Sequence, residues 1–190
     1  MAKSVLVPIA DGSEEIEAIC IIDILRRAGA QVTVASVDLD GALTITASRR
    51  TTLVADCHIN DCLQQSFDLI AIPGGLPGAE HLRDCNSLTG LLQEHNAQGK
   101  WVAAICAAPA LVFESHGLLT GKKATAHPGF VNQIKSGTPC PDTRVVIDGN
   151  CITSQAPGTA IEFSLELVRQ LFGEDKCNEV AGPMVVSHPQ

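Results

Sequence analysis

The chain has 190 residues, of which 45% are hydrophobic and 18% charged, and its formal net charge is −8. This length and balance predict a globular α/β chain, so we expect a single domain over residues 1–190. Basic residues occur singly or as isolated pairs and form no basic stripe, which argues against nucleic acid as a partner, and no apolar run approaches the ~18 residues of a membrane span.

Strands and helices alternate from the beginning of the chain. Hydrophobic spacing predicts a strand over residues 3–9, a helix over 14–28 and a second strand over 31–37. Ser13 stands where an N-terminal helix cap is expected, with acidic residues following it in the first turn. These three elements form a βαβ unit.

The next segments continue this alternation of strands and helices, with one exception. A β-hairpin outside the parallel winding is predicted for residues 43–47 and 52–55. Residues 68–73 form a third parallel strand, and a helical stretch over 79–96 is broken near residues 85–86. The remaining elements are predicted as a strand at Trp101–Ile105, a helix at 107–114, an extended segment at 124–126, a small helix at 127–134, strands at 144–148 and 151–153, helices at 157–171 and 175–181, and a Pro-containing tail.

This alternation predicts a parallel sheet covered by helices on both faces. Ligands bind such sheets at the carboxyl ends of the strands. The segments that follow those ends are 11–17, 73–75, 106–108, 126–127 and 154–158. We therefore expect the functional residues to gather at this edge.

Eight cysteines stand at positions 20, 57, 62, 85, 106, 140, 151 and 177. The opening MAKSVLVPIA predicts a strand and not a secretory signal, so we expect reduced thiols in a reducing, cytoplasmic compartment. The tightest spacing is Cys57-x4-Cys62. No second pair stands at zinc spacing, so we expect no metal site and no cofactor.

Cys106 follows a predicted buried strand, with Ala104 two residues before it and Ala108 two residues after it. This is the spacing of a nucleophile elbow, with alanines and a cysteine in place of glycines and a serine. The elbow would place the thiol at a helix N-terminus, where N–H groups and the helix dipole lower its pKa well below the free value of ~8.5. The alternative is a buried cysteine that only fills space.

Five motifs together resemble one family. They are DGSEEIEA at 11–18, PGG at 73–75, AAICAAP at 103–109, AHP at 126–128 and TSQAPGT at 153–159. Their order is similar to that of the ThiJ/PfpI superfamily, and most of all to its DJ-1 branch. The resemblance implies a flavodoxin-like parallel sheet sandwiched between helices with a small β-hairpin, a homodimer, and a reactive cysteine at Cys106.

The resemblance also implies partners for this cysteine. Glu17, which helical spacing by itself would place at the surface, would turn its carboxyl toward the sulfur and stay protonated, because burial and like charge raise its pKa. His127 would lie nearby, Asp23 would reach the histidine of a partner subunit, and Arg49 would lie near the interface. For each, a solvated surface residue is the alternative.

Backbone groups and a loop complete the candidate site. Gly75 and Ala107 could offer their N–H groups as an oxyanion hole, although a glycine pair such as Gly74–Gly75 usually forms a plain turn. Ser154 and Gln155 lie on a loop near the site. Gln155 stands where some similar proteins carry Arg, which leaves substrate preference open.

Three functions fit these residues. The first is an enzyme of the glutathione-independent glyoxalase or protein deglycase type, in which Cys106 attacks a small carbonyl compound and Glu17 and His127 move protons, with a role in oxidative or carbonyl stress. The second is a redox sensor or stress chaperone in which Cys106 is oxidised to a sulfinate. An amidohydrolase or a thiamine-related enzyme is a third reading, but no histidine has Glu two residues later and no phosphate-binding loop is present.

Overall fold

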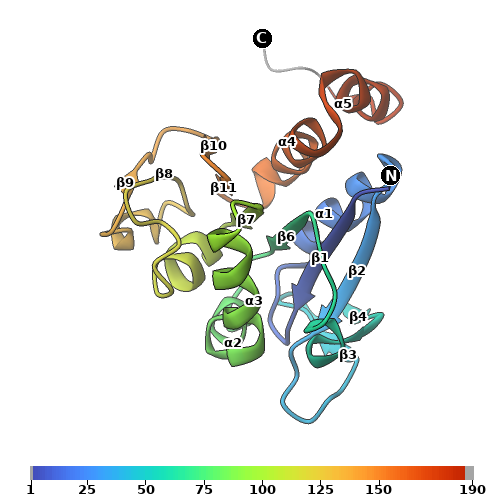
Figure 1. Cartoon of the computed structure of the whole chain (residues 1–190), viewed down its shortest axis with the longest axis vertical. Coiled ribbons are helices and arrows are strands. Elements are labelled where there is room, and N and C mark those ends of the chain that lie inside the picture. Colours follow the sequence, from blue (N-terminus) through green and yellow to red (C-terminus); the bar gives the residue numbers. More distant parts are fainter. Residues whose placement is uncertain (1, 187–190) are drawn as a thin grey trace.

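A mostly parallel seven-stranded sheet runs through the centre of the molecule, in the computed structural model that describes residues 2–186 (Figure 1). Residues 187–190 of the predicted tail lie outside the described part. Each neighbouring pair of strands is parallel except the pair at one edge, which is antiparallel. Across the sheet the strands are β10 (Val145–Asp148), β11 (Cys151–Ser154), β7 (Trp101–Ile105), β6 (Leu69–Ile72), β1 (Ser4–Ile9), β2 (Gln31–Ser36) and β5 (Cys57–His58).

Helices cover both faces of this sheet, as the alternation of elements predicted. The side chains of β1 alternate between two buried clusters, with Val5 and Val7 in one and Leu6 in the other. The first cluster lies under α1 (Glu15–Arg27), α4 (Ala160–Phe172) and α5 (Glu174–Ala181), and the second lies under α2 (Gly78–Asp84) and α3 (Asn86–Ala97). The predicted break between helices α2 and α3 falls at Cys85, where a ψ of 103° puts the backbone in an extended conformation.

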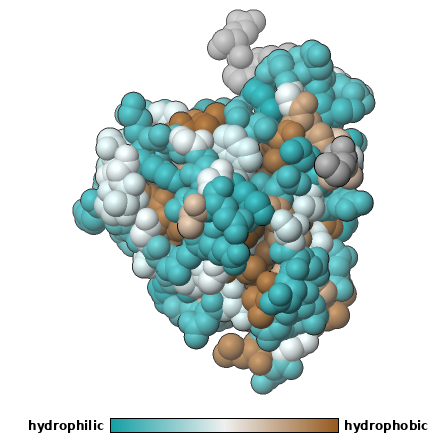
Figure 2. Space-filling model, in the orientation of Figure 1, coloured by the Kyte–Doolittle hydropathy of each residue, from teal (hydrophilic) through white to brown (hydrophobic). Residues whose placement is uncertain are grey.

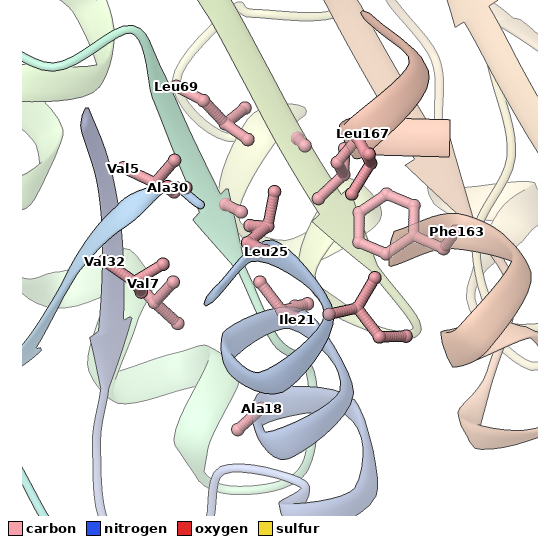
Figure 3. Packing of buried hydrophobic residues seen from close by; sticks show 14 of the residues in the cluster. Val5, Val7, Ala18, Ile21, Leu25, Ala30, Val32, Leu69, Phe163 and Leu167 are labelled. Atoms are coloured by element: carbon pink, nitrogen blue, oxygen red, sulfur yellow. The ribbon is translucent and has the colours of Figure 1, made fainter. Parts of the chain in front are cut away.

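The first cluster joins the first helix of the chain to the long helix near its end. Ile21 and Leu25 of α1 pack beside Phe163 and Leu167 of α4 on the same face of the sheet (Figure 3). All four side chains are fully buried. On the face drawn in Figure 2, hydrophilic residues predominate and apolar residues form small separate patches, so most of the apolar side chains lie inside.

Two small sheets and four short helices connect these elements. The predicted hairpin is present as β3 (Thr44–Thr46) and β4 (Thr52–Val54), and β8 (Lys123–Ala124) pairs in parallel with β9 (Thr138–Pro139). The short helices are η1 (Ile59–Cys62), η2 (Pro109–Phe113), η3 (Val131–Gln133) and η4 (Pro157–Thr159). None of the helices within residues 2–186 has the length and apolarity that crossing a membrane requires.

Three local features differ from the prediction or were not predicted. The helix predicted at 107–114 is present, but as the π-helical η2 and not as a regular α-helix, because Glu114 N donates to Pro109 O across five residues. Ser13 does not cap α1, since its hydroxyl accepts from the N–H of Ala10. The edge strand β5 was missed, because two residues are too few to show a period and only pairing with β2 defines them.

Candidate active site

Cys106 occupies a strained turn directly after β7. Its φ is +66°, a left-handed conformation that non-glycine residues seldom adopt. Two backbone hydrogen bonds hold it there: Cys106 N donates to Ser154 O at 3.1 Å, and Cys106 O accepts from His127 N at 2.7 Å. The tight turn predicted from the small flanking residues is therefore present, and β11 and the segment after β8 support it.

Glu17 lies under the Cys106 turn with 0% of its surface exposed. It sits in the first turn of α1, and the face that carries it continues with Ala18 and Ile21 into the core. Its Oε2 accepts from Gly74 N at 2.8 Å, while Oε1 is buried without a hydrogen-bond partner among the described residues. The surface position that spacing alone predicted is wrong, and the orientation implied by the family resemblance is correct.

Glu14, and not Ser13, caps α1 and shapes the charge around Glu17. The Glu14 carboxylate accepts from Glu17 N at 2.8 Å, so it lies close to the buried carboxyl. Burial raises the pKa of Glu17 to about 7; the Gly74 N–H opposes this rise and the Glu14 charge adds to it. A carboxyl with this pKa exchanges its proton near neutrality, which is the range that general acid–base chemistry uses.

The thiol of Cys106 is not acidified in the way the elbow predicted. Burial and the Glu17 charge raise the pKa of this thiol to about 12, against the opposing effect of the Gly75 and Ala107 N–H groups. The prediction of a pKa well below ~8.5 was therefore wrong. It assumed a regular helix N-terminus at Ala107, whereas the structure has a turn, and it left out the carboxylate beside the sulfur.

Gly74 and Gly75 bring their backbone against the site because neither has a side chain. A Cβ on Gly74 would lie 2.6 Å from Cys106 Cβ and 3.0 Å from Glu17 Oε2. A Cβ on Gly75, whose φ is +91°, would lie 2.3 Å from Gly12 O. The Gly75 and Ala107 N–H groups act to lower the pKa of the Cys106 thiol, so they belong to the surroundings of its sulfur. The glycine pair is therefore more than a plain turn.

Cys106 opens into a pocket of about 290 Å³. The sequence predicted no site role for five of its lining residues, which are Glu14, Ser48, Leu76, Phe130 and Pro157. Glu14 and Pro157 lie in two of the five motifs, whereas the other three carry no motif signal. The complete lining is Glu14, Ser48, Arg49, Gly75, Leu76, Cys106, Ala107, His127, Phe130 and Pro157.

His127 lines this pocket with its ring orientation fixed. Gly129 N donates to His127 Nδ1 at 3.1 Å, so the neutral ring carries its proton on Nε2. The ring of Phe130 meets it edge-on at a centroid distance of 6.0 Å. Within residues 2–186 no hydrogen bond joins the His127 ring to Cys106, so the arrangement is looser than a protease triad.

Arg49 reaches the pocket on a loop that Glu15 holds. The Glu15 carboxylate accepts from Arg49 N at 2.9 Å and from Ser48 Oγ at 2.8 Å. Burial acts to raise the pKa of Glu15, but these hydrogen bonds outweigh it and hold that pKa at about 2. Glu15 therefore stays charged and fixes the pocket wall.

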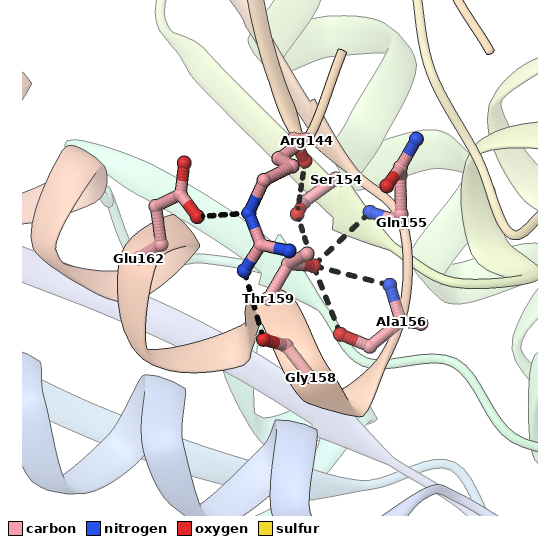
Figure 4. A network of polar contacts seen from close by, with 7 residues as sticks. All are labelled: Arg144, Ser154, Gln155, Ala156, Gly158, Thr159 and Glu162. Atoms are coloured by element: carbon pink, nitrogen blue, oxygen red, sulfur yellow. Dashed lines mark hydrogen bonds and ion pairs between the residues drawn. The ribbon is translucent and has the colours of Figure 1, made fainter. Parts of the chain in front are cut away.

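Ser154 and Gln155 lie behind the pocket and not in its lining. Ser154 Oγ donates to Arg144 O at 2.7 Å and contacts Thr159 Oγ1 at 2.7 Å (Figure 4). Gln155 Nε2 donates to Pro141 O at 2.6 Å. Both residues support the loop that carries Pro157, so they lie near the site, where the prediction placed them, without entering the pocket lining.

Asp23 lies away from the pocket, exposed on α1, where it forms an ion pair with Arg27 at 2.6 Å. Its contact with the histidine of a partner subunit stays a prediction. Among residues 2–186, no cluster of three His, Cys, Asp or Glu side chains is placed to hold a metal ion. A second pocket of about 380 Å³, beside Asp38 and His81, is larger but contains no cysteine on a strained turn.

Comparison with known proteins shows which family this chain is similar to. The model of the DJ-1/PfpI family matches residues 3–170. The chain is 46% identical over 184 residues to Protein DJ-1 homolog B of Arabidopsis thaliana; this match covers 97% of the chain and 42% of that protein, so the chain spans less than half of that relative's length.

Two further relatives match over nearly their whole length. The solved structure of Toxoplasma gondii DJ-1 in its oxidized form has a TM-score of 0.95 and 45% identity, with 98% of this chain and 100% of that chain covered. The Caenorhabditis elegans protein named Glutathione-independent glyoxalase DJR-1.2 is 34% identical over 184 residues, with 96% of this chain and 95% of that protein covered. This chain belongs to the DJ-1/PfpI family.

Proposed function

We propose that the chain is a cofactor-free enzyme that converts small reactive carbonyl compounds, with Cys106 as nucleophile and Glu17 as proton carrier. The observation that carries this proposal is the buried Glu17 carboxyl beside the Cys106 thiol, with Oε1 unpartnered and a pKa that burial raises to about 7. The name of the Caenorhabditis elegans relative, a glutathione-independent glyoxalase, supports the same reaction class.

The proposed reaction starts with the proton of the thiol. The raised pKa of Cys106 means that its thiolate forms only as a neighbouring base takes the proton, and Glu17 is that base. Sulfur adds to the aldehyde carbon of methylglyoxal, which gives a hemithioacetal. The Gly75 and Ala107 N–H groups, which act to lower the pKa of the Cys106 thiol, are placed to stabilise the charge that develops on the substrate oxygen.

The later steps move protons between adjacent carbons. Glu17 first passes the thiol proton to the substrate oxygen, which leaves it free to take the proton from the hemithioacetal carbon. It returns that proton to the next carbon of the enediolate, while His127 Nε2 relays a proton from one substrate oxygen to the other, so both residues are regenerated. The product is a thioester of Cys106, which water hydrolyses to lactate and the free thiol. Sugar-like adducts of proteins, the deglycase substrates, would be attacked in the same way.

The experiment is lactate formation from methylglyoxal in the absence of glutathione. We expect wild-type protein to form lactate and Cys106→Ser to form none, because the serine hydroxyl is a far weaker nucleophile at the same pH. Cys140→Ser, at a half-buried cysteine outside the pocket, is the control and should keep the wild-type rate. Lactate formation by Cys106→Ser would contradict the proposal.

A redox role for the same cysteine is the second candidate. The unpartnered Oε1 of Glu17 and the N–H groups of Gly75 and Ala107 would donate hydrogen bonds to a Cys106 sulfinate, provided that Glu17 is protonated. Intact mass after mild peroxide tests this role. A gain of two oxygen atoms at Cys106 is expected, and oxidation at other cysteines alone would contradict it.

We also propose that the chain acts as a homodimer through α1, in a reducing compartment such as the cytoplasm. Ile16 and Ile19 are 53% and 46% exposed on this helix, which is unusual for large apolar side chains placed together. All eight cysteines are free thiols, which fits a reducing compartment. Neither nucleic acid nor a membrane is a proposed partner.

A further inference from the structure

Cys57 and Cys62 lie with their sulfur atoms 3.6 Å apart. Cys57 is on the edge strand β5, and Cys62 is the last residue of η1, which follows directly. Residues 2–186 contain all eight cysteines, and within them this is the one pair whose sulfur atoms are in hydrogen-bond contact. The pair plays no part in the proposed carbonyl chemistry.

The backbone between the two cysteines is held in place. Cys57 pairs with Ala35 of β2. His58 N donates to Asp61 Oδ2 at 3.3 Å, and Asn60 N donates to His58 Nδ1 at 3.3 Å, so a reciprocal cap closes the turn. His58 Nε2 lies 2.9 Å from Asp38 O, which ties the turn to the loop after β2. The thiols are therefore brought together by the fold and not by a flexible loop.

The two thiols differ in their access to solvent. Cys57 is half-buried, whereas Cys62 has no exposed surface. Burial, together with a hydrogen bond to Cys57 and the Cys57 charge, raises the pKa of Cys62 to about 12. Cys62 therefore keeps its hydrogen and can donate it to the sulfur of Cys57. An oxidant from solvent meets Cys57 first.

We propose that Cys57 and Cys62 form a reversible disulfide site that responds to peroxide independently of Cys106. Peroxide transfers one oxygen to the Cys57 sulfur, which gives a sulfenic acid and releases water. Cys62 then attacks that sulfur, forms the S–S bond and expels a second water molecule, so two thiols and one H₂O₂ give one disulfide and two H₂O. A dithiol reductant returns both thiols.

The geometry supports this reaction in two ways. The sulfur atoms must approach from 3.6 Å to the ~2.05 Å of a disulfide, a distance that side-chain rotation can supply. In addition, Cys62 belongs to the buried cluster on the α2 and α3 side of the sheet, whereas Cys106 packs against the cluster on the α1 and α4 side. The sheet therefore separates the pair from Cys106.

The test is peptide mapping of the full chain after mild peroxide, followed by acid quench and alkylation of free thiols. A protease that cleaves before aspartate separates the two cysteines, because it cuts at Asp56, Asp61 and Asp68 and yields peptides 56–60 and 61–67. We expect these two peptides to be linked in the non-reduced digest and separate after dithiothreitol. Cys106→Ser should form the link to the same extent.

Variants decide between a disulfide and independent oxidation. Cys57→Ser and Cys62→Ser should each abolish the link, and in Cys62→Ser the sulfenic acid of Cys57 should persist long enough to be trapped by dimedone. Wild-type protein in which Cys57 is oxidised but no linked peptides appear would overturn the proposal. A link that forms no faster in the folded chain than in urea would also overturn it, because the fold would then contribute nothing.

Discussion

The backbone N–H of Gly74 donates to Oε2 of Glu17 at 2.8 Å, which leaves Oε1 as the one oxygen of a fully buried carboxyl without a partner. A polar atom buried in this way costs free energy unless it is protonated and donates, or unless a ligand satisfies it. Since the Cys106 thiol is its neighbour, this oxygen is suited to exchange a proton with the sulfur.

Glu17→Gln should shift the ionisation of Cys106. Burial and the Glu17 charge raise the pKa of this thiol, and the variant removes the charge. We expect the pH midpoint of Cys106 alkylation to fall by about one to three units, because only the thiolate is alkylated. Mass-mapped iodoacetamide labelling from pH 5 to 11 measures it, with the exposed Glu80→Gln as control.

The same variant separates the two candidate roles. Glutamine keeps a hydrogen-bond donor but cannot carry a proton, so methylglyoxal turnover should collapse while Cys106 remains open to oxidation by peroxide. Glu17→Asp shortens the reach and should impair both. If Glu17→Gln turns over methylglyoxal at the wild-type rate, Glu17 is no proton carrier and the proposed mechanism is wrong.

Gly74→Ala should disturb the site through its shape. The added Cβ would lie 2.6 Å from Cys106 Cβ and 2.9 Å from Ile105 O, and backbone cannot yield cheaply. We expect the free energy of unfolding to fall by about 1–3 kcal/mol, with loss of turnover. Gly90→Ala on α3, where nothing lies within 4 Å, should keep activity and raise the stability slightly. Urea unfolding and lactate assays measure both; equal effects would refute the steric explanation.

His95 should make the protein sensitive to acid. Burial lowers the pKa of His95 to about 4 from 6.5, and its Nε2 is buried without a partner among the described residues. The unfolded chain therefore binds the proton more readily, so stability is full above pH 6.5 and is lost as pH falls toward 4. We expect His95 to contribute a loss of about 2 kcal/mol between pH 8 and pH 5.

Urea unfolding at the two pH values tests this contribution. His95→Gln removes the titrating group, so its free energy of unfolding should fall about 2 kcal/mol less over the same range than that of wild type. His81→Gln, at an exposed histidine of α2, should keep the wild-type pH dependence. An unchanged slope in His95→Gln would show that another group is responsible.

The proposed dimer predicts a specific effect on α1. Wild-type protein at micromolar concentration should sediment at twice the 19.9 kDa of the chain. Ile19→Glu should sediment as a monomer, because it places a charge on the apolar face of α1. Ile161→Glu, at a similarly exposed isoleucine of α4, should leave the dimer intact. A wild-type monomer at this concentration would contradict the proposal.

The sequence by itself determined the architecture and the position of Cys106 at a tight turn after a central strand. The apolar run Trp101–Ile105 and the small residues around Cys106 predicted a buried strand and a tight turn, and both are present. The reason is that both features are local: burial of a central strand requires continuous apolar residues, and a tight strand-to-helix turn tolerates only small neighbours.

Only the tertiary structure decided the chemistry at Cys106 and the pairing of Cys57 with Cys62. Helical spacing places Glu17 and Glu14 on the same face of α1 but does not show what covers that face. In the folded chain, the sheet and the Gly74 backbone bury Glu17. The pKa of Cys106 likewise depends on a carboxyl 89 positions away, reversing the local expectation. Burial and close charge act across space, so the order of residues along the chain does not reveal them.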